Sequence, residues 1–200
     1  MMSRSYHNKY NHFELYRAFV LMLRSVVTVS SNRIFENFDS KFSERLMLAV
    51  TEVNGCEACS WAHARMALSE GFSQDEIESF LSGSDKYIIP EEAVGILFGQ
   101  EYANQRGYVT KLSYQKLIDT YGKKKGKKIV ATIQVMMFAN TSGLTISAFF
   151  SRLKKEPYEN SSLLYELSMM FAPIVFAPFA LIQAVLESIL RISKIRFIKD

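Results

Sequence analysis

Residues 44–63 read ERLMLAVTEVNGCEACSWAH, and this stretch holds both cysteines of the 200-residue chain, Cys56 and Cys59. His63 follows Cys59 by four residues, so a helix would carry the two thiols and the imidazole along one face. Asn54-Gly55 interrupts the pattern just before the cysteines. An Asn-Gly pair also joins strands in hairpins, but the leucines, methionine and alanine before it favour a helix. The stretch therefore predicts two helices joined by a tight turn.

A carboxylate lies at a matching distance on the other side of the turn. Glu44 precedes the turn by about ten residues and His63 follows it by about eight, so at ~1.5 Å per residue they reach similar depths in an antiparallel pair. We therefore expect Glu44, His63 and Cys59 to form a relay of carboxylate, imidazole and thiol. Alternatively, Glu44 only begins an amphipathic helix. Glu52 and Glu57 flank the motif as substitute carboxylates, although solvent exposure or structural ion pairs suit them better.

Two thiols beside an imidazole form either a redox site or a metal site. Only a thiolate attacks an electrophile, and a basic partner or a helix N-terminus favours that form. A second thiol one turn away, here Cys56, can then close a disulfide on an oxidised Cys59. Zinc binding by the two cysteines with His63 and Glu44 is the chemical alternative, and a redox-sensing pair without catalysis is a further one.

The spacing resembles that of a known family. Glu44, eleven intervening residues, Cys56-x-x-Cys59 and then x-x-x-His63 look like the alkylhydroperoxidase D branch of the carboxymuconolactone decarboxylase superfamily. Val53-Asn54-Gly55 before the first cysteine, and a Gly71-Phe72-Ser73 turn before an acidic capping box, are also similar. The specific resemblance covers about 35 residues, and the later part of the chain agrees only in its general helical pattern.

The resemblance implies an all-α helical bundle in which a helical hairpin carries the site and the subunits form trimers or hexamers. It implies a thiol peroxidase or disulfide reductase that needs no metal or flavin cofactor and takes electrons from a dithiol reductant or partner enzyme. Cys59 would attack, Cys56 would resolve, and His63 with Glu44 would transfer protons. Ala58 departs from members that carry a histidine between the cysteines. The decarboxylases proper lack this cysteine pair, which argues against lactone decarboxylation.

The rest of the chain reads as helix with short breaks, in one domain spanning 1–200. Within it we expect a helical N-terminal extension over about 1–38 and an apolar helical region over about 162–200. A solvated loop is expected at the lysine run 123–128. In the first half of the chain, helices are expected at 13–29, closed by Ser30-Ser31-Asn32, at 42–53, from the motif to Glu70, and from the Ser73 capping box through Phe80. In the second half, they are expected from Pro90 to about Gln105, from a Ser113 cap to Gly122, at 128–140 and at 142–153.

The C-terminal region contains about 20 consecutive uncharged residues, from Leu167 to Leu186, a length that spans a bilayer. Pro173 and Pro178 interrupt the stretch, and no insertion signal precedes it. We therefore expect a buried helix pair or an oligomer interface in a homo-oligomer rather than a membrane span. Contact with a membrane surface stays open, as does the spanning alternative.

Composition places the protein among ordinary globular chains, with 48% hydrophobic and 22% charged residues and a net charge of +4. No broad basic face points to nucleic acid. The first residues lack the basic and then apolar pattern of a signal peptide, so we do not expect secretion. Two close cysteines without a wider disulfide framework suit a reducing cytoplasm. His7 and His12 are expected at the surface and Trp61 in the core. Asn140 is expected either to cap a helix or to contact the site.

Overall fold

The computed structural model describes residues 5–35 and 39–198, and in this part of the chain it confirms the all-α fold. Two-residue strands are the only other regular elements among these residues. The elements are α1 (His12–Phe35), α2 (Ser40–Asn54), α3 (Glu57–Ser69), α4 (Gln74–Leu81), α5 (Pro90–Asn104), β1 (Tyr108–Val109), α6 (Lys111–Leu153), α7 (Leu163–Ile189) and β2 (Arg196–Phe197).

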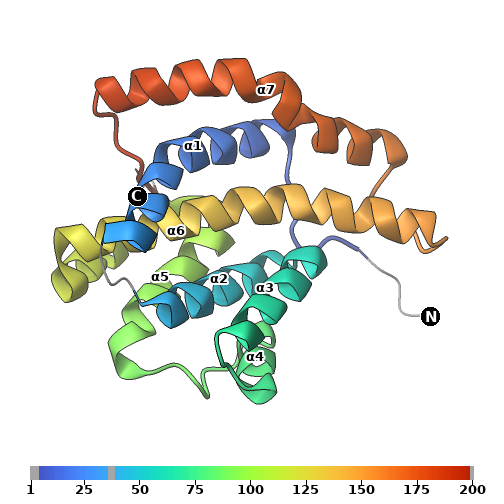
Figure 1. Cartoon of the computed structure of the whole chain (residues 1–200). Coiled ribbons are helices and arrows are strands. Elements are labelled where there is room, and N and C mark those ends of the chain that lie inside the picture. The colour runs from blue at the N-terminus through green and yellow to red at the C-terminus, as the bar shows by residue number, and fades with distance from the viewer. Residues whose placement is uncertain (1–4, 36–38, 199–200) are drawn as a thin grey trace.

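Helix α6 runs through the middle of the molecule, and the other helices lie on its two sides (Figure 1). On one side, α1 packs on α6 and α7 packs mainly on α1. On the other side lies the group α2 to α5, in which α2 and α5 contact α6 and each other. The main core lies between α6 and this group, around side chains such as Leu46, Ile96 and Ile133, and it extends to Leu15 of α1 and Met169 of α7. The N-terminal and C-terminal helices α1 and α7 therefore lie on one side of α6, and α2 to α5 lie on the other.

The predicted helical hairpin is present as α2 and α3. Asp39 caps α2 by accepting a hydrogen bond from the backbone N–H of Lys41 at 3.0 Å. Helix α2 ends at Gly55, whose φ of 68° is the left-handed conformation that glycine adopts without a Cβ clash. Helix α3 begins two residues later. Because the turn is this short, the cysteines at the start of α3 lie beside the C-terminal end of α2.

Several expected boundaries in the central helix are wrong, although the expected break at Gly122 is present as a kink. The residues expected as three helices and a lysine loop form one element, α6, which is kinked at Gly122 (φ 71°, ψ 164°). Thr110 caps it, accepting from the N–H of Ser113 at 3.1 Å, so Ser113 is not the cap. The lysine run after Gly122 is helical and Lys128 is buried. Lysine is a good helix former, so a single glycine break does not require a loop around it.

The two terminal helices also differ from expectation. Helix α1 does not end at Ser30 but continues to Phe35. The expected buried helix pair at the C-terminus is wrong, because α7 is one helix with Pro173 and Pro178 inside it. It bends along its length, as prolines that remove backbone donors cause helices to do (Figure 1).

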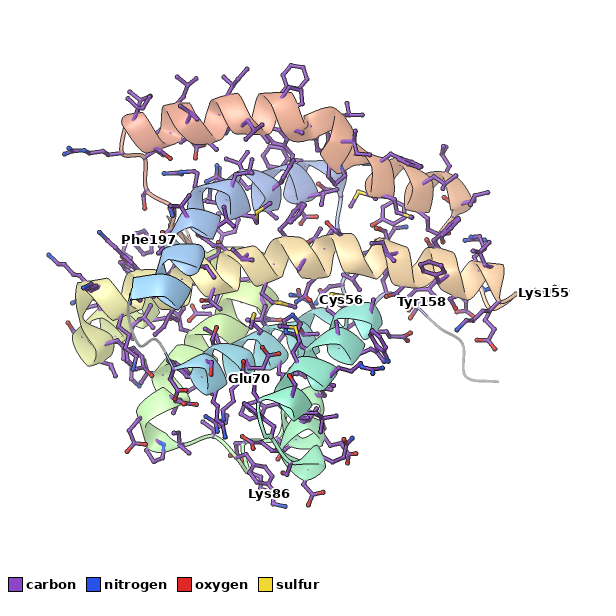
Figure 2. The ribbon with its side chains drawn as sticks, viewed as in Figure 1. Cys56, Glu70, Lys86, Lys155, Tyr158 and Phe197 are labelled. Atoms are coloured by element: carbon purple, nitrogen blue, oxygen red, sulfur yellow. A yellow bond between two sulfur atoms is a disulfide. The ribbon has the colours of Figure 1, made fainter. Side chains whose placement is uncertain are left out.

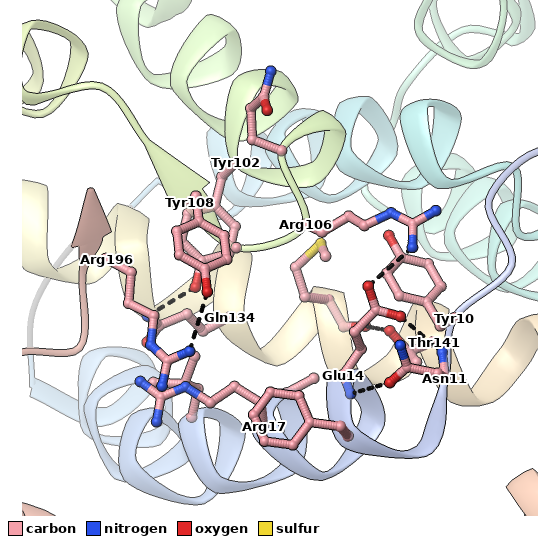
Figure 3. A pocket seen from close by; sticks show the side chains of 16 residues that line it. Tyr10, Asn11, Glu14, Arg17, Tyr102, Arg106, Tyr108, Gln134, Thr141 and Arg196 are labelled. Atoms are coloured by element: carbon pink, nitrogen blue, oxygen red, sulfur yellow. Dashed lines mark hydrogen bonds and ion pairs between the residues drawn. The ribbon is translucent and has the colours of Figure 1, made fainter. Parts of the chain in front are cut away.

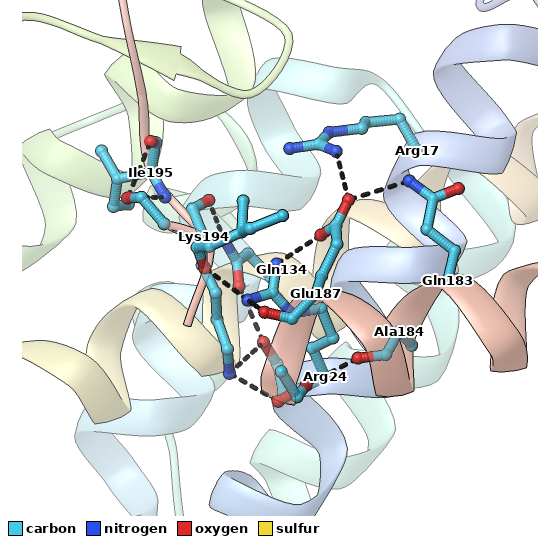
Figure 4. A network of polar contacts seen from close by, with 12 residues as sticks. Arg17, Arg24, Gln134, Gln183, Ala184, Glu187, Lys194 and Ile195 are labelled. Carbon is cyan, nitrogen blue, oxygen red and sulfur yellow. Dashed lines mark hydrogen bonds and ion pairs between the residues drawn. The ribbon is translucent and has the colours of Figure 1, made fainter. Parts of the chain in front are cut away.

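Charged groups hold α7 against the rest of the molecule near both of its ends. Near the start of α7, the buried carboxylate of Glu166 accepts two hydrogen bonds from Arg152, each 2.8 Å. Near its end, Glu187 accepts from Arg24 and from Arg17 on α1 (Figure 4). Between these points Ala180 and Ala184 pack against Val20 of α1. Small residues thus bring α7 close to α1, with ion pairs at each end.

The outer face of α7 is apolar and open to solvent. Only 22% of its most apolar window is buried inside the protein, whereas the corresponding window of α6 is 72% buried. Among the described residues these two helices are long and apolar enough to cross a membrane by length and composition. The core position of α6 accounts for its apolarity. On α7 the exposed side chains include Phe171, Ile174, Val175, Phe179, Leu181, Ile182, Val185, Leu186, Ile189 and Leu190.

A short clip that the sequence did not predict joins distant parts of the chain. Strand β1, between α5 and α6, pairs in parallel with β2, and Tyr108 aligns with Arg196. The N–H of Ile198 also donates to the carbonyl of Val109 at 2.9 Å. The clip returns the C-terminal segment to the junction of α5 and α6.

Candidate redox site

Cys56 and Cys59 are joined by a disulfide at the start of α3, with their Cα atoms 5.3 Å apart (Figure 2). Cys56 is the N-cap residue of α3, and its Sγ accepts a hydrogen bond from the N–H of Cys59 at 3.3 Å. The first N–H groups of a helix have no partner inside the helix, and together they attract negative charge. Both sulfurs lie at this N-terminus, which therefore favours negative charge on the one that becomes a thiolate when the disulfide is reduced.

Glu44 of α2 and His63 of α3 meet across the hairpin. Oε1 of Glu44 lies 2.6 Å from Nδ1 of His63, and the two side chains are 4% and 13% exposed. The carboxylate therefore holds Nδ1 as the protonated nitrogen and leaves Nε2 for exchange with another group. His63 is one helical turn beyond Cys59 on the same face of α3.

The other carboxylates considered lie elsewhere. Glu57 is exposed at the start of α3. Glu52 points toward the backbone of Gly83, with Oε1 3.2 Å from where a Cβ on that glycine would stand. Burial raises the pKa of Glu52, partly offset by the charge of His7. Glu44 is thus the carboxylate that the fold brings to the imidazole.

Helix α6 covers the disulfide, which the sequence did not reveal. A Cβ built on Gly143 would stand 2.6 Å from both Cys56 Sγ and Cys59 Sγ, so only a glycine fits there without displacement. One turn further, Ser147 Oγ accepts from the N–H of Ala58 at 3.1 Å and donates to the carbonyl of Gly143 at 2.9 Å. Small residues four apart in an apolar helix are the signal that could have indicated this close approach.

A polar layer lies behind the turn that carries the cysteines. Asn54 donates to the carbonyl of Val50 at 3.0 Å and to Sδ of Met137 at 3.3 Å, and it accepts from the hydroxyl of Tyr10. Asn140 is buried in the same region and accepts from Thr51 at 3.2 Å. Its Nδ2 is buried and lacks a hydrogen-bond partner within the described part of the chain.

Some residues noted in the sequence lie outside this arrangement. His7 and His12 are exposed, as expected. The prediction that Trp61 belongs to the core is wrong, because its side chain is 65% exposed and the Arg65 guanidinium lies over its ring at 5.0 Å. Among the residues that the structure describes, no three His, Cys, Asp or Glu side chains form a group able to hold a metal ion.

The arrangement offers a thiol pair and a proton carrier, all largely shielded from solvent. Cys56 is fully buried and Cys59 is 8% exposed, so a reagent reaches Cys59 rather than Cys56. The imidazole one turn away can take a proton from a thiol or give one to a leaving oxygen or sulfur. These are the requirements of thiol–disulfide exchange and of thiol oxidation by a peroxide.

One of the comparisons with known proteins gave a match. The sequence model of the carboxymuconolactone decarboxylase family matches residues 14–87, which run from α1 to the segment after α4. The match is to the family as a whole and does not single out one branch. Neither the curated proteins nor the solved structures gave a match to this chain. Over residues 14–87, which contain the cysteine pair with Glu44 and His63, the chain is similar to the carboxymuconolactone decarboxylase family.

Proposed function

We propose that this protein is a cytoplasmic thiol-dependent oxidoreductase that reduces hydroperoxides or passes electrons between dithiols and disulfides. One observation carries the proposal: a Cys56–Cys59 disulfide at a helix N-terminus, next to a Glu44–His63 pair with a 2.6 Å contact. Similarity to the family alone supports only an enzyme class, because the family includes decarboxylases as well as thiol peroxidases.

The proposed reaction balances in three steps. The thiolate of Cys59 attacks the peroxide, the O–O bond breaks, and the alcohol leaves with a proton from His63, which leaves Cys59 as a sulfenic acid. The thiol of Cys56 then attacks that sulfur, and water departs as the disulfide forms. An external dithiol reduces the disulfide and is itself oxidised to a disulfide. Glu44 orients the imidazole and stabilises its protonated form.

The exposure of the two cysteines supports an order of reaction. Because Cys59 is 8% exposed and Cys56 is fully buried, we propose Cys59 as the attacking thiol. The Cys59→Ser variant should lose peroxide turnover. The Cys56→Ser variant should react once and stop as a sulfenic acid or an adduct of Cys59. Labelling in a single turnover, followed by mass spectrometry, identifies the sulfur that is modified first, and modification of Cys56 would reverse the assignment.

The same samples separate catalysis from the other readings of the site. Rapid peroxide-driven disulfide formation without bound zinc, together with turnover on a dithiol donor, supports the enzyme. Stoichiometric zinc in the reduced protein would instead support a zinc clip. Disulfide formation without turnover on any of several dithiol donors would support a redox sensor.

We further propose that the protein forms a homo-oligomer through the outer face of α7, with a trimer or hexamer implied by the resemblance. Ten apolar side chains, nine on α7 and one on its C-cap residue Leu190, are each more than half exposed. Together they present about 1,000 Å² to solvent, which exceeds the roughly 800 Å² per partner of a standard interface. The ion pairs of Glu166 and Glu187 lie on the opposite, inward side, where a second copy leaves them undisturbed.

A further inference from the structure

A cavity with a volume of about 360 Å³ lies apart from the cysteine pair. It lies between α1, the end of α5, α6 and β2, and none of the four proposed redox residues lines it (Figure 3). Its volume falls within the range of small-molecule sites. The unpredicted β1–β2 clip forms one of its walls, through Tyr108 and Arg196.

The lining carries more positive than negative charge. Arg17, Arg106 and Arg196 face the cavity, and Glu14 is the only acidic residue in its lining. Glu14 is already paired with Arg106 at 2.9 Å and also accepts from the N–H of Asn11 at 2.8 Å. The negative charge of Glu14 is therefore already paired, at one side of the cavity. Arg17 and Arg196 converge on the other side (Figure 3).

The partners of these two arginines leave room for an anion. Arg17 reaches Glu187 at 3.3 Å, but Glu187 is shared with Arg24, and Nε of Arg17 is buried without a hydrogen-bond partner among the described residues. Arg196 contacts a neutral group, the hydroxyl of Tyr108, at 3.4 Å. Burial and the charge of Arg196 both lower the pKa of Arg17, a sign that these cations repel each other.

The remainder of the lining is largely aromatic and aliphatic. Phe13, Leu21 and Met137 supply apolar surface, and Tyr102 adds a ring whose hydroxyl accepts from Gln134 at 3.2 Å. Burial raises the pKa of Tyr102 to about 12, so the phenol stays neutral. A ligand that fits must therefore combine a charged end with an apolar body.

We propose that this cavity binds a small organic carboxylate, with its carboxylate between Arg17 and Arg196 and its apolar body against Leu21 and Met137. Guanidinium groups bind carboxylates in a paired geometry, and such hydrogen bonds are stronger than those between neutral groups. The volume suits a molecule of roughly 10–20 non-hydrogen atoms. The proposal is independent of the redox function.

Calorimetric titration of the oxidised full-length chain tests this with 4-phenylbutyrate and its uncharged counterpart 4-phenylbutanol. We expect saturable one-to-one binding of the acid and at least tenfold weaker binding of the alcohol. The alcohol also controls for adhesion to the apolar face of α7. Equal binding of both compounds, or no saturable binding of the acid at millimolar concentration, would overturn the proposal.

Variants locate the site. Arg196→Gln should weaken binding of 4-phenylbutyrate at least tenfold, whereas Arg65→Gln, the same change at an exposed arginine on α3, should leave it unchanged. Arg196 lies in β2, so its replacement would also weaken binding if it disrupted the pairing of β1 with β2. A second variant, which keeps Arg196, separates these two causes. Ala18→Phe places a ring in the cavity from α1 and should abolish binding with all three arginines intact. Equal loss in Arg65→Gln, or full binding by Ala18→Phe, would contradict the assignment.

Discussion

Replacing Gly143 by alanine tests the contact between α6 and the disulfide. The added Cβ would stand 2.6 Å from each sulfur, about 1 Å closer than an ordinary contact. Both sulfurs are tied to the start of α3, so neither can move aside as the end of a flexible side chain would. We therefore place the overpacking cost near the upper end of the usual range, at about 3 kcal/mol. Alanine regains about 1 kcal/mol of helix propensity, which leaves a net loss of about 2 kcal/mol.

Thermal unfolding of the oxidised protein, followed by circular dichroism, measures this loss. For a chain of this size 2 kcal/mol corresponds to a fall in Tm of about 4–8 °C. Gly126→Ala is the matched control on the same helix, because its Cβ would meet only the terminal methyl of Ile118, at 2.8 Å. That methyl can turn away, so the control should match the wild type or exceed it. An unchanged Tm in Gly143→Ala, or an equal fall in Gly126→Ala, would refute the reasoning.

The same variant should respond to reduction. Free thiols at Cys56 and Cys59 can take separate rotamers, so the reduced Gly143→Ala protein should lose less stability than the oxidised one. Because the variant destabilises the oxidised form more than the reduced form, the disulfide becomes easier to reduce. If about 1.4 kcal/mol of the cost is relieved on reduction, the reduction potential rises by about 30 mV. Equilibration of variant and wild type against a dithiol buffer measures this difference, and an equal potential would show that the clash is not specific to the disulfide.

Three further predictions follow from the described contacts. His63→Gln and Glu44→Gln should each slow peroxide reduction, and the double variant should lose much less than the sum in steady-state assays, because the two groups act as one unit. Burial alone would raise the pKa of Glu187, but its hydrogen bond from Gln183 and the charges of Arg17 and Arg24 leave it below 4.5. Ionised Glu187 thus adds stability above about pH 4.5, and this stability is lost as the pH falls through the folded-state pKa. In denaturant unfolding, Glu187→Gln should lower the free energy of unfolding by about 3 kcal/mol at pH 7, and this free energy should fall less steeply in acid than that of the wild type. Light scattering without detergent should show an oligomer, and truncation at about Asn160 should give aggregates, whereas a stable monomer would mean that the α7 face needs no cover.

The hairpin could be predicted because its signals are local. The Asn54-Gly55 break and the spacing between the cysteines and His63 act within a few residues, and the structure has the corresponding turn and helix. The Ser73 cap is also present, with Oγ accepting from the N–H of Glu76 at 3.1 Å. Such signals depend on backbone geometry and capping, which the chain neighbours determine.

The cover of the disulfide could not be predicted, because it depends on residues far along the chain. Gly143 and Ser147 approach the cysteines only after α6 docks on the hairpin, and the small residues that permit this approach do not specify which part of the chain they meet. The exposure of Trp61 has the same origin. An aromatic residue on α3 is buried only if another helix reaches it, and the helices stop short of this one.

The position of α1 has a consequence for the order of folding. Helix α1 comes first among the described elements, yet it packs on α6 and α7. Most residues of these two helices lie more than a hundred positions further along the chain than α1. Helices α2 to α5 instead find one another within a short part of the chain. Loop closure makes distant pairings slower to form than near ones. The hairpin of α2 and α3 should therefore form early, and α1 should dock only after α6 and α7 have formed. The protein would then pass through a stage in which the two cysteines are in place before the cavity lined by Arg17 and Arg196 is closed.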